Sequence, residues 1–478
     1  MAAAMASQPS SPSVPAPELR TLVSHPELAS RHSFPVFRTL GERQKGPIER
    51  ALSLFADVRA GEGVGVLLLT LNVFLLLGLY YLLRSARQGL ILTEHDLPFG
   101  LTGSQLAAYS AAGMAVVLLG VVPLFGWLAS RVPRMRLISI TTFFFAANLG
   151  VFFLLGRAGW RIAAPFYIWL GVFNVFVVAQ FWSFANDLYT EGQGRRLFPL
   201  IGVGASLGAL VGASSVSYLV RQFAFTPFTL MLVAGGVLLL ALGITWVVNN
   251  RESATADPEG QKAEQEPLGK EGGFALVLRD PYLRWIGLLT ILLNIVNSVG
   301  GFLLNQVVEN NANAVGVIAE RQQFVTIFFS TFDARVSLVG LLLQLFVTSR
   351  ALRYWGVRGS LFILPVIALA NYSIIAVAPV LAVIRLGKIL ENSTDYSIQN
   401  TLRQALFLPT SREAKYKAKS VIDTFCTRFG DVLQAVVVFG GTAIGLGVWG
   451  FAWLNVALTL VWLAVAVQIA REHRKKTV

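Results

Sequence analysis

Apolar runs of about twenty residues recur along most of this chain of 478 residues, and short polar connections separate them. Because an α-helix rises about 1.5 Å per residue, a run of this length crosses the hydrocarbon core of a bilayer. The predicted membrane-spanning helices are twelve, at residues 64–92, 105–129, 138–156, 164–188, 197–220, 226–248, 283–306, 323–347, 360–378, 379–408, 420–445 and 448–470. The predicted fold class is therefore an all-α polytopic membrane protein.

Composition agrees with this class, since 55% of the residues are hydrophobic and 14% are charged. The net charge of +13 is spread over the short connections, so we interpret it as charge that orients the protein and not as a nucleic-acid surface. The single cysteine, Cys426, excludes an intramolecular disulfide, and the four histidines lie in tails or loops. We therefore expect no metal site, no cofactor and no nucleic-acid partner. The expected partners are the lipid bilayer and a small solute, and the expected state is a monomer.

Two halves of the sequence repeat at an offset of about 222 residues. Glu191 in TEGQGRR matches Glu413 in REAKYKAK, and Gly208 matches Gly430 at the same separation. The basic turns SRVPRMR and RYWGVRG, after the second and eighth predicted helices, fall on nearly the same offset. Equal offsets predict two pseudo-symmetric bundles of six helices.

Composition also divides the chain into segments. Residues 1–47 are rich in Ala, Ser and Pro and have no apolar run of signal-peptide length, so we expect a disordered tail and no cleaved secretion signal. The remaining predicted units are an amphipathic interfacial helix at 48–62, an N-terminal six-helix bundle at 63–248, a cytoplasmic linker at 249–282, a C-terminal six-helix bundle at 283–470 and a basic tail at 471–478.

The charged connections predict the orientation in the membrane. With an even number of helices both termini lie on one side, and the connections on that side carry clustered Lys and Arg residues. Basic loops remain in the cytoplasm, so we expect a multi-pass protein of the cell inner (plasma) membrane with both termini cytoplasmic.

One predicted helix is unusually polar. The segment 379–409 carries five charged residues within transmembrane length, namely Arg385, Lys388, Glu391, Asp395 and Arg403. An ionisable group at the bilayer centre costs roughly 2.5–3.5 kcal/mol on insertion scales, so this stripe must face protein or a water-filled cavity. Glu391 and Asp395 either neutralise Lys388 and Arg385 or couple transport to proton movement.

In a six-plus-six repeat, the first, fourth and seventh helices are equivalent to the tenth, and each carries a polar stripe. The candidate substrate-binding residues on these four helices are Arg84, Arg87, Gln88, Asn186, Asp187, Asn297, Lys388, Asn392, Gln399 and Arg403. Guanidinium groups donate two parallel hydrogen bonds to a phosphate or carboxylate, so the expected solute is anionic. The alternative for Arg84 and Arg87 is that they extend to the membrane interface.

The glycine-rich run GVGASLGALVG at 202–212 superficially suggests a nucleotide loop. No strand precedes it, and it lies inside an apolar helix. We therefore interpret it as close helix packing by small residues.

Parallel six-helix repeats of this size resemble the major facilitator superfamily, and the turn GWLASRVPRMR is similar to that superfamily's signature, with Ser130 where an acid is expected and Pro133 where Gly is usual. Three further segments resemble the ATP/ADP translocase family of plastids and intracellular bacteria, namely YYLLRSARQGLILT, FWSFANDLYTEGQGRRLFPLIGVGASLGALVG and DYSIQNTLRQALFLPTSREAKYKAKSVID. DPYLR and FFSTFDA look similar as well, and the resemblance is collinear across most of residues 64–440.

The resemblance implies a nucleotide transporter that handles phosphates with charges in its membrane helices. By motif position, the family's basic residues in the first and tenth helices fall on Arg87 and Arg403. Its acidic residues in the fourth and seventh helices fall near Leu170 and Gly301, so both acids are lost. This departure keeps anion binding but indicates a divergent member with a different solute preference.

These observations predict a secondary active transporter that moves an anionic solute by alternating access, with a nucleotide or another phosphorylated or organic anion as the solute. The alternatives are a proton-coupled transporter of a non-nucleotide solute and a transport-inactive membrane sensor or assembly protein. A membrane enzyme is not expected, because no nucleophile–base or metal constellation is present.

Overall fold

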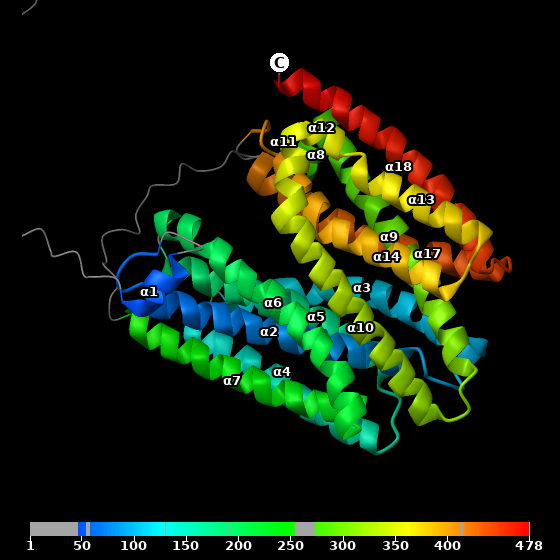
Figure 1. Cartoon of the computed structure of the whole chain (residues 1–478), viewed down its shortest axis with the longest axis horizontal. Coiled ribbons are helices and arrows are strands. Elements are labelled where there is room, and N and C mark those ends of the chain that lie inside the picture. The colour runs from blue at the N-terminus through cyan, green and yellow to red at the C-terminus, as the bar shows by residue number, and fades with distance from the viewer. Residues whose placement is uncertain are drawn as a thin grey trace, which may run out of the picture.

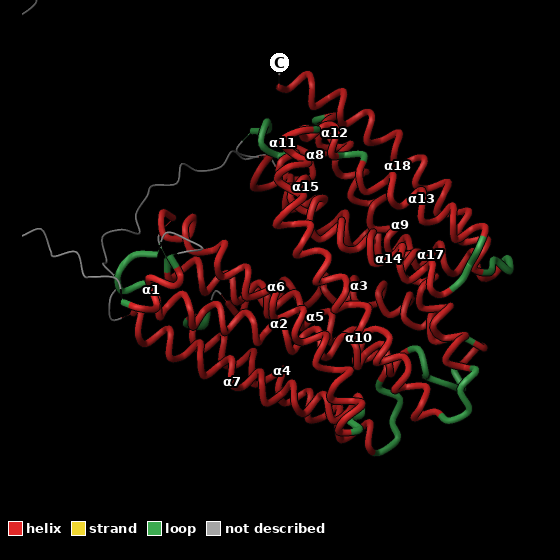
Figure 2. The backbone as a smooth tube through the Cα atoms, viewed as in Figure 1, coloured by secondary structure: helices red, strands yellow, loops and turns green. Residues whose placement is uncertain are grey.

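The computed structural model describes residues 46–53, 58–129, 131–189, 191–253, 273–411 and 414–477. Within these ranges the regular elements are helices, with no strand (Figure 2). The predicted tail before residue 46, most of the predicted linker, and Ser130 of the facilitator-like turn lie outside the described residues.

The N-terminal half holds eight helical elements. They are α1 (Pro47–Leu52), α2 (Gly63–Ile91), the short 3-10 turn η1 (Pro98–Gly100), α3 (Gly103–Ala129), α4 (Arg134–Arg157), α5 (Ala163–Leu188), α6 (Glu191–Phe223) and α7 (Pro227–Ser253). The apolar periods predicted α2 to α7 as the first six spans, and each of these helices is long and apolar enough to cross a bilayer.

The C-terminal half contains more interrupted helices. Its elements are α8 (Gly273–Arg279), α9 (Pro281–Asn313), α10 (Ile318–Leu343), η2 (Gln344–Thr348), α11 (Ser349–Tyr354), α12 (Gly356–Ser360), α13 (Ile363–Val377), α14 (Leu381–Thr394), η3 (Asp395–Gln399), α15 (Asn400–Leu406), η4 (Ala414–Ala418), α16 (Lys419–Val421), η5 (Ile422–Cys426), α17 (Thr427–Ala443) and α18 (Val448–Thr477). The elements η2 to η5 are π-helical segments; η2, η3 and η5 each join the helices on either side, and η4 continues into α16.

In the described part of the chain, ten helical segments are long and apolar enough to span a membrane. The predicted spans 379–408 and 420–445 are not among these ten. Both are nevertheless helical, from Leu381 to Leu406 and from Ala414 to Ala443, and both are divided by π-helical segments. The predicted tail 471–478 continues α18 as far as Thr477, so most of that segment is helical.

The helices form two bundles that meet along α10. Within the first bundle α2 packs along α6 and α7, and within the second α9 packs along α17 and α18. Between the bundles, α10 packs against α2 and α6, and α17 packs against α3. In Figure 1 the bundles lie together at the end where α3 begins and spread apart toward the end with α1 and α8. The all-α, two-bundle fold predicted from the sequence is confirmed.

The glycine-rich run of α6 lies against α2. A Cβ atom on Gly204, Gly208 or Gly212 would lie 2.5, 2.2 or 2.1 Å from the backbone oxygen of Thr70, Phe74 or Gly78, respectively. The two backbones therefore approach closely only because these side chains are absent. The interpretation of this run as helix packing is confirmed.

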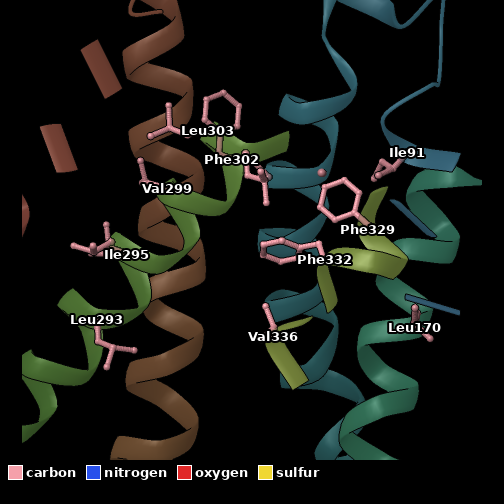
Figure 3. Packing of buried hydrophobic residues seen from close by; sticks show 14 of the residues in the cluster. Ile91, Leu170, Leu293, Ile295, Val299, Phe302, Leu303, Phe329, Phe332 and Val336 are labelled. Carbon is pink, nitrogen blue, oxygen red and sulfur yellow. The ribbon is translucent and has the colours of Figure 1, made fainter. Parts of the chain in front are cut away.

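A continuous apolar core extends through both bundles. Figure 3 shows Phe302 and Leu303 of α9 on one side of this cluster and Phe329 and Phe332 of α10 near its centre, with Leu170 of α5 beyond them. Leu170, near which the family resemblance places an acidic residue, is fully buried in this apolar cluster. The core thus frames the polar residues described next.

Candidate functional site

A cavity of about 220 Å³ lies between the two bundles. Its wall is built by α2, α3 and α5 of the first half and by α9, α10, α14 and α17 of the second. The polar or charged residues in this wall are Arg84, Arg87, Gln88, Ser104, Tyr167, Ser298, Asn305, Lys388, Asn392 and Gln434. Three of them are cations, and no described carboxylate lies in the wall.

Arg84 connects the two halves across this cavity. Its Nε atom lies 3.2 Å from Oδ2 of Asp333 on α10, in an ion pair whose geometry is not that of an aligned hydrogen bond. Asp333 is 2% exposed, so its charge is held in the interior beside Arg84. The Asp333 carboxylate therefore pairs with a residue of the cavity wall without lining the cavity itself.

Arg87, one turn further along α2, is surrounded differently. Its guanidinium lies over the ring of Tyr167, with 4.0 Å between Cζ and the ring centroid. Its Nε atom is buried and has no hydrogen-bond partner, and no carboxylate of the described residues lies within ion-pair distance. Arg87 is therefore a cation in the cavity wall that makes no ion pair among the described residues, although Asp333, the partner of Arg84, attracts it from beyond ion-pair distance.

Lys388 on α14 has its full set of protein partners. Its ammonium donates to Oε1 of Glu391 at 3.0 Å, to Oδ1 of Asn297 at 2.7 Å and to the Asn297 carbonyl at 3.2 Å. The side chain is 2% exposed. An ammonium has three donors, so these bonds satisfy it completely.

The carboxylate of Glu391 accepts further hydrogen bonds from α13. The Tyr372 hydroxyl donates to Oε2 at 2.8 Å, and the Asn371 amide donates to the same atom at 3.3 Å. A Cβ atom on Gly300 of α9 would lie 1.9 Å from the Tyr372 hydroxyl, and one on Gly387 would lie 1.6 Å from Oδ1 of Asn371. The network thus requires glycine at both positions.

Asp395 and the residues beyond it make no hydrogen bond to this network within the described residues, although Asp395 lies close enough to Lys388 and Glu391 to interact with their charges. Asp395 begins the π-helical segment η3, is 8% exposed, and has an Oδ1 atom with no hydrogen bond among the described residues. Gln399 is also buried, with its Oε1 atom unpartnered there. Arg403 of α15 is not part of the cavity wall, and its Nε atom has no hydrogen-bond partner in the described chain.

The structure does not bring Asn186 and Asp187 into the cavity. Both are exposed in the last turn of α5, where Asp187 pairs with Arg134 of α4, with 3.3 Å between Oδ2 and Nη1. Arg134 also donates to Asn249 of α7 at 2.9 Å. The polar end of α5 therefore joins three helix ends and does not face the cavity.

Arg385 also differs from its predicted surroundings, because it pairs with neither Glu391 nor Asp395. Its Nη2 atom donates to Thr331 of α10 at 2.7 Å. On a helix of about 3.6 residues per turn, positions six residues apart lie about 120° apart, so Arg385 and Glu391 face different neighbours.

Several residues of the site were missed from the sequence. Asp333 lies within the motif FFSTFDA, and its isolation in an apolar run was the signal that could have identified it. Tyr167 and Tyr372 gave no such signal, because single polar residues in apolar helices are common.

A second inter-half contact lies beside the cavity, next to the lining residue Ser104. Glu309 of α9 is 7% exposed and accepts hydrogen bonds from the backbone amides of Gly103 and Ser104, at 2.7 and 2.8 Å. These amides belong to the first turn of α3, where backbone donors are free and the helix dipole favours an anion. In addition, the Gln88 amide donates to Asn305 at 3.4 Å.

Comparisons with known proteins agree with this architecture. The family described as TLC ATP/ADP transporter matches residues 157–473. ADP,ATP carrier protein 1 of Chlamydia pneumoniae is 22% identical over 357 residues, covering 65% of this chain and 67% of the relative. ADP,ATP carrier protein 2 of the same organism is 20% identical, covering 82% of this chain and 86% of the relative. The crystal structure of the nucleoside transporter NupG superimposes with a TM-score of 0.59 at 17% identity, over 83% of this chain and 98% of that one.

The chain thus has the fold of solved transporters such as NupG, and the matching family is one of membrane transporters. Within that class, the chain belongs to the TLC ATP/ADP transporter family. The resemblance to the ATP/ADP translocases is thereby confirmed.

Proposed function

We propose that this protein is a secondary active transporter that moves an anionic solute, a nucleotide or another phosphorylated or organic anion, by alternating access between its halves. The observation that carries this proposal is the charge of the cavity wall, which has three cations and no carboxylate among its described residues. Asp333 and Glu391 neutralise Arg84 and Lys388 from behind the wall. The charge of Arg87 is left for a solute.

A nucleotide fits this surface chemically. The guanidinium of Arg87 can donate two parallel hydrogen bonds to a phosphate, and aromatic rings such as Tyr167 and Phe332 in the same wall offer apolar surface to a base. The names of the relatives, which are ADP,ATP carriers, support this solute class. Gly301 contributes no side chain to the wall and Leu170 is in the core, so the charges that the family resemblance places there are absent.

The test is uptake into liposomes that contain the purified protein, with labelled ATP, ADP and inorganic phosphate offered separately. Arg87→Ala should lower uptake about ten- to a hundredfold, the range expected for losing a hydrogen bond to a charged group. Arg87→Lys should retain part of the activity as a point charge. Arg221→Ala removes an exposed arginine at the end of α6 and should leave uptake unchanged. Equal uptake by all variants would refute a role for the cavity.

A second candidate is proton-coupled transport, and Asp395 is the observation that favours it. This carboxylate is buried and has one oxygen without a hydrogen bond in the described chain, whereas Glu391 is held in an ion pair. If Asp395 carries the proton, Asp395→Asn abolishes accumulation driven by a pH gradient and spares exchange across preloaded vesicles. Transport by the unmodified protein that does not depend on pH would eliminate this candidate.

We also propose that the protein lies in the cell inner membrane with both termini in the cytoplasm. The loop before α3 and the segment η4 provide sites for a test, because the proposed orientation places the loop outside and η4 in the cytoplasm. The segment η4 packs against α8, at the end of the molecule where the halves spread apart. With Cys426 replaced by serine, a cysteine at Asp96 should react with an impermeant thiol reagent from outside, and one at Lys417 should not. The opposite pattern would invert the orientation.

A further inference from the structure

A second hollow lies in the C-terminal bundle, between α10 and α14. It is a groove of about 600 Å³ that shares no lining residue with the central cavity. Its walls are aliphatic and aromatic side chains, with the exception of Arg335 and Arg385. Two guanidinium groups thus lie in an otherwise apolar groove.

Arg385 is positioned by its neighbours on α10. Its Cζ atom lies 4.7 Å from the ring centroid of Phe328, and its Nη2 atom donates to Thr331. Its Nε atom is buried without a hydrogen-bond partner among the described residues. Arg385 therefore has fixed orientation and unused donor capacity.

Arg335 adds a second positive charge to the same groove. Its side chain is exposed, and it lies close enough to Arg385 for the two charges to repel. No carboxylate lines the groove, and neither arginine forms an ion pair within the described ranges. Two cations beside an apolar surface are unfavourable in a membrane unless an anion accompanies them.

The position of Arg385 along α14 indicates a lipid phosphate as the source of that anion. Arg385 is four residues after the first residue of α14, which is about 6 Å along the helix axis. Because the predicted span of this helix begins at residue 379, we infer that Arg385 lies near the boundary between head groups and acyl chains, within reach of a lipid phosphate. Arg335 can extend toward the same level through its long side chain.

We propose that this groove binds an anionic phospholipid, with its phosphate between Arg335 and Arg385 and an acyl chain along Phe324, Phe328 and Leu386. Charge complementarity favours a lipid with net negative charge, because a zwitterionic head group would add a cation to two arginines. The apolar walls favour a lipid and not free phosphate. This site is distinct from the solute cavity and does not depend on the proposed function.

The experiment is a thermal-unfolding titration of the purified protein in detergent with short-chain phosphatidylglycerol, phosphatidylcholine or inorganic phosphate. A ligand that binds the native state raises the Tm. We expect phosphatidylglycerol to raise the Tm more than either other compound. The double variant Arg335→Gln/Arg385→Gln should weaken the apparent affinity for phosphatidylglycerol at least tenfold, and the exposed-arginine control Arg221→Gln should not.

Arg335→Gln alone keeps the test decisive if the double variant does not fold, because the Arg335 side chain has no hydrogen bond in the described structure. It should weaken the preference for phosphatidylglycerol severalfold. Equal Tm shifts with both lipids, or shifts unchanged by Arg335→Gln, would overturn the proposal and leave both arginines as interfacial residues. A shift produced by inorganic phosphate alone would overturn the lipid assignment.

Discussion

Lys388 and Arg87 are two cations of the same cavity, and they differ in the protein partners that surround them. Lys388 makes all three of its ammonium hydrogen bonds to protein, one of them to Glu391. Arg87 contacts the ring of Tyr167 and has no carboxylate partner in the described chain. A buried charge requires a counter-charge. The second half neutralises its own cation, whereas Arg87 of the first half has no ion pair among the described residues and is our proposed contact for a solute anion. A charged residue in a membrane helix can therefore be structural or solute-binding, and its partners distinguish the two.

The largest effect should come from breaking the Lys388 network. Lys388→Ala leaves the Glu391 carboxylate buried without its cation, which should lower the free energy of unfolding by about 3–5 kcal/mol. Thermal unfolding in detergent measures this loss. The paired variant Lys388→Met/Glu391→Leu removes both charges and should be markedly less destabilised. If Lys388→Ala unfolds like the unmodified protein, the distinction between the two cations is wrong.

A smaller effect should follow from removing the carboxylate partner of Arg84, so that Arg84, like Arg87, makes no ion pair. Asp333→Asn removes the carboxylate that lies 3.2 Å from the Arg84 Nε atom, so a second cation becomes available to an anion. We expect the apparent affinity for the transported anion to rise about tenfold, or about 1.4 kcal/mol, as measured by thermal-shift titration. An affinity that falls would mean that Asp333 holds Arg84 in its binding orientation.

The smallest effect should come from the ion pair between Glu62 and Arg196, which lies outside the membrane interior. Burial acts to raise the pKa of Glu62, but hydrogen bonds from Arg196, the Arg59 backbone amide and Gln193 outweigh it, so the pKa lies below its ordinary value. A carboxylate with a lowered folded-state pKa stabilises at pH above its unfolded pKa, and the stabilisation is lost as the pH falls through the folded pKa.

Glu62→Gln should therefore lower the free energy of unfolding by at most about 1 kcal/mol at neutral pH, and by less in acid. Thermal unfolding at both pH values gives the difference. Glu320→Gln removes an exposed carboxylate of α10 and serves as the control. A loss at Glu62 that is unchanged in acid would show that the carboxylate acts by packing alone.

Hydrophobic periodicity was sufficient to predict the helices, because each span must satisfy its backbone within itself in a bilayer. Periodicity could not predict the π-helical segments such as Asp395–Gln399, since these depend on packing and not on composition. It also did not show that α18 continues to Thr477, because a basic helix end and a basic tail have the same composition.

The candidate site was predicted in part. The polar stripe of the first helix suggested Arg84, Arg87 and Gln88, and all three line the cavity, while their role in binding stays a prediction. For Asp187 the same reasoning was insufficient, because its partner Arg134 belongs to another helix and the pairing depends on how the ends of α4 and α5 meet. The role of Glu309 likewise depends on α3 and α9 from different halves, a proximity that no local pattern encodes.

The glycine contacts between α6 and α2 have a mechanical consequence. Where backbones touch directly, no flexible side chain lies between them to absorb a displacement, so the two helices have little freedom to slide past each other. A displacement of α6 must then shift α2 by nearly the same amount, and Arg84 and Arg87 with it. In the proposed alternating-access motion, Arg84 and Arg87 would therefore move together with the α2–α6 pair relative to Lys388.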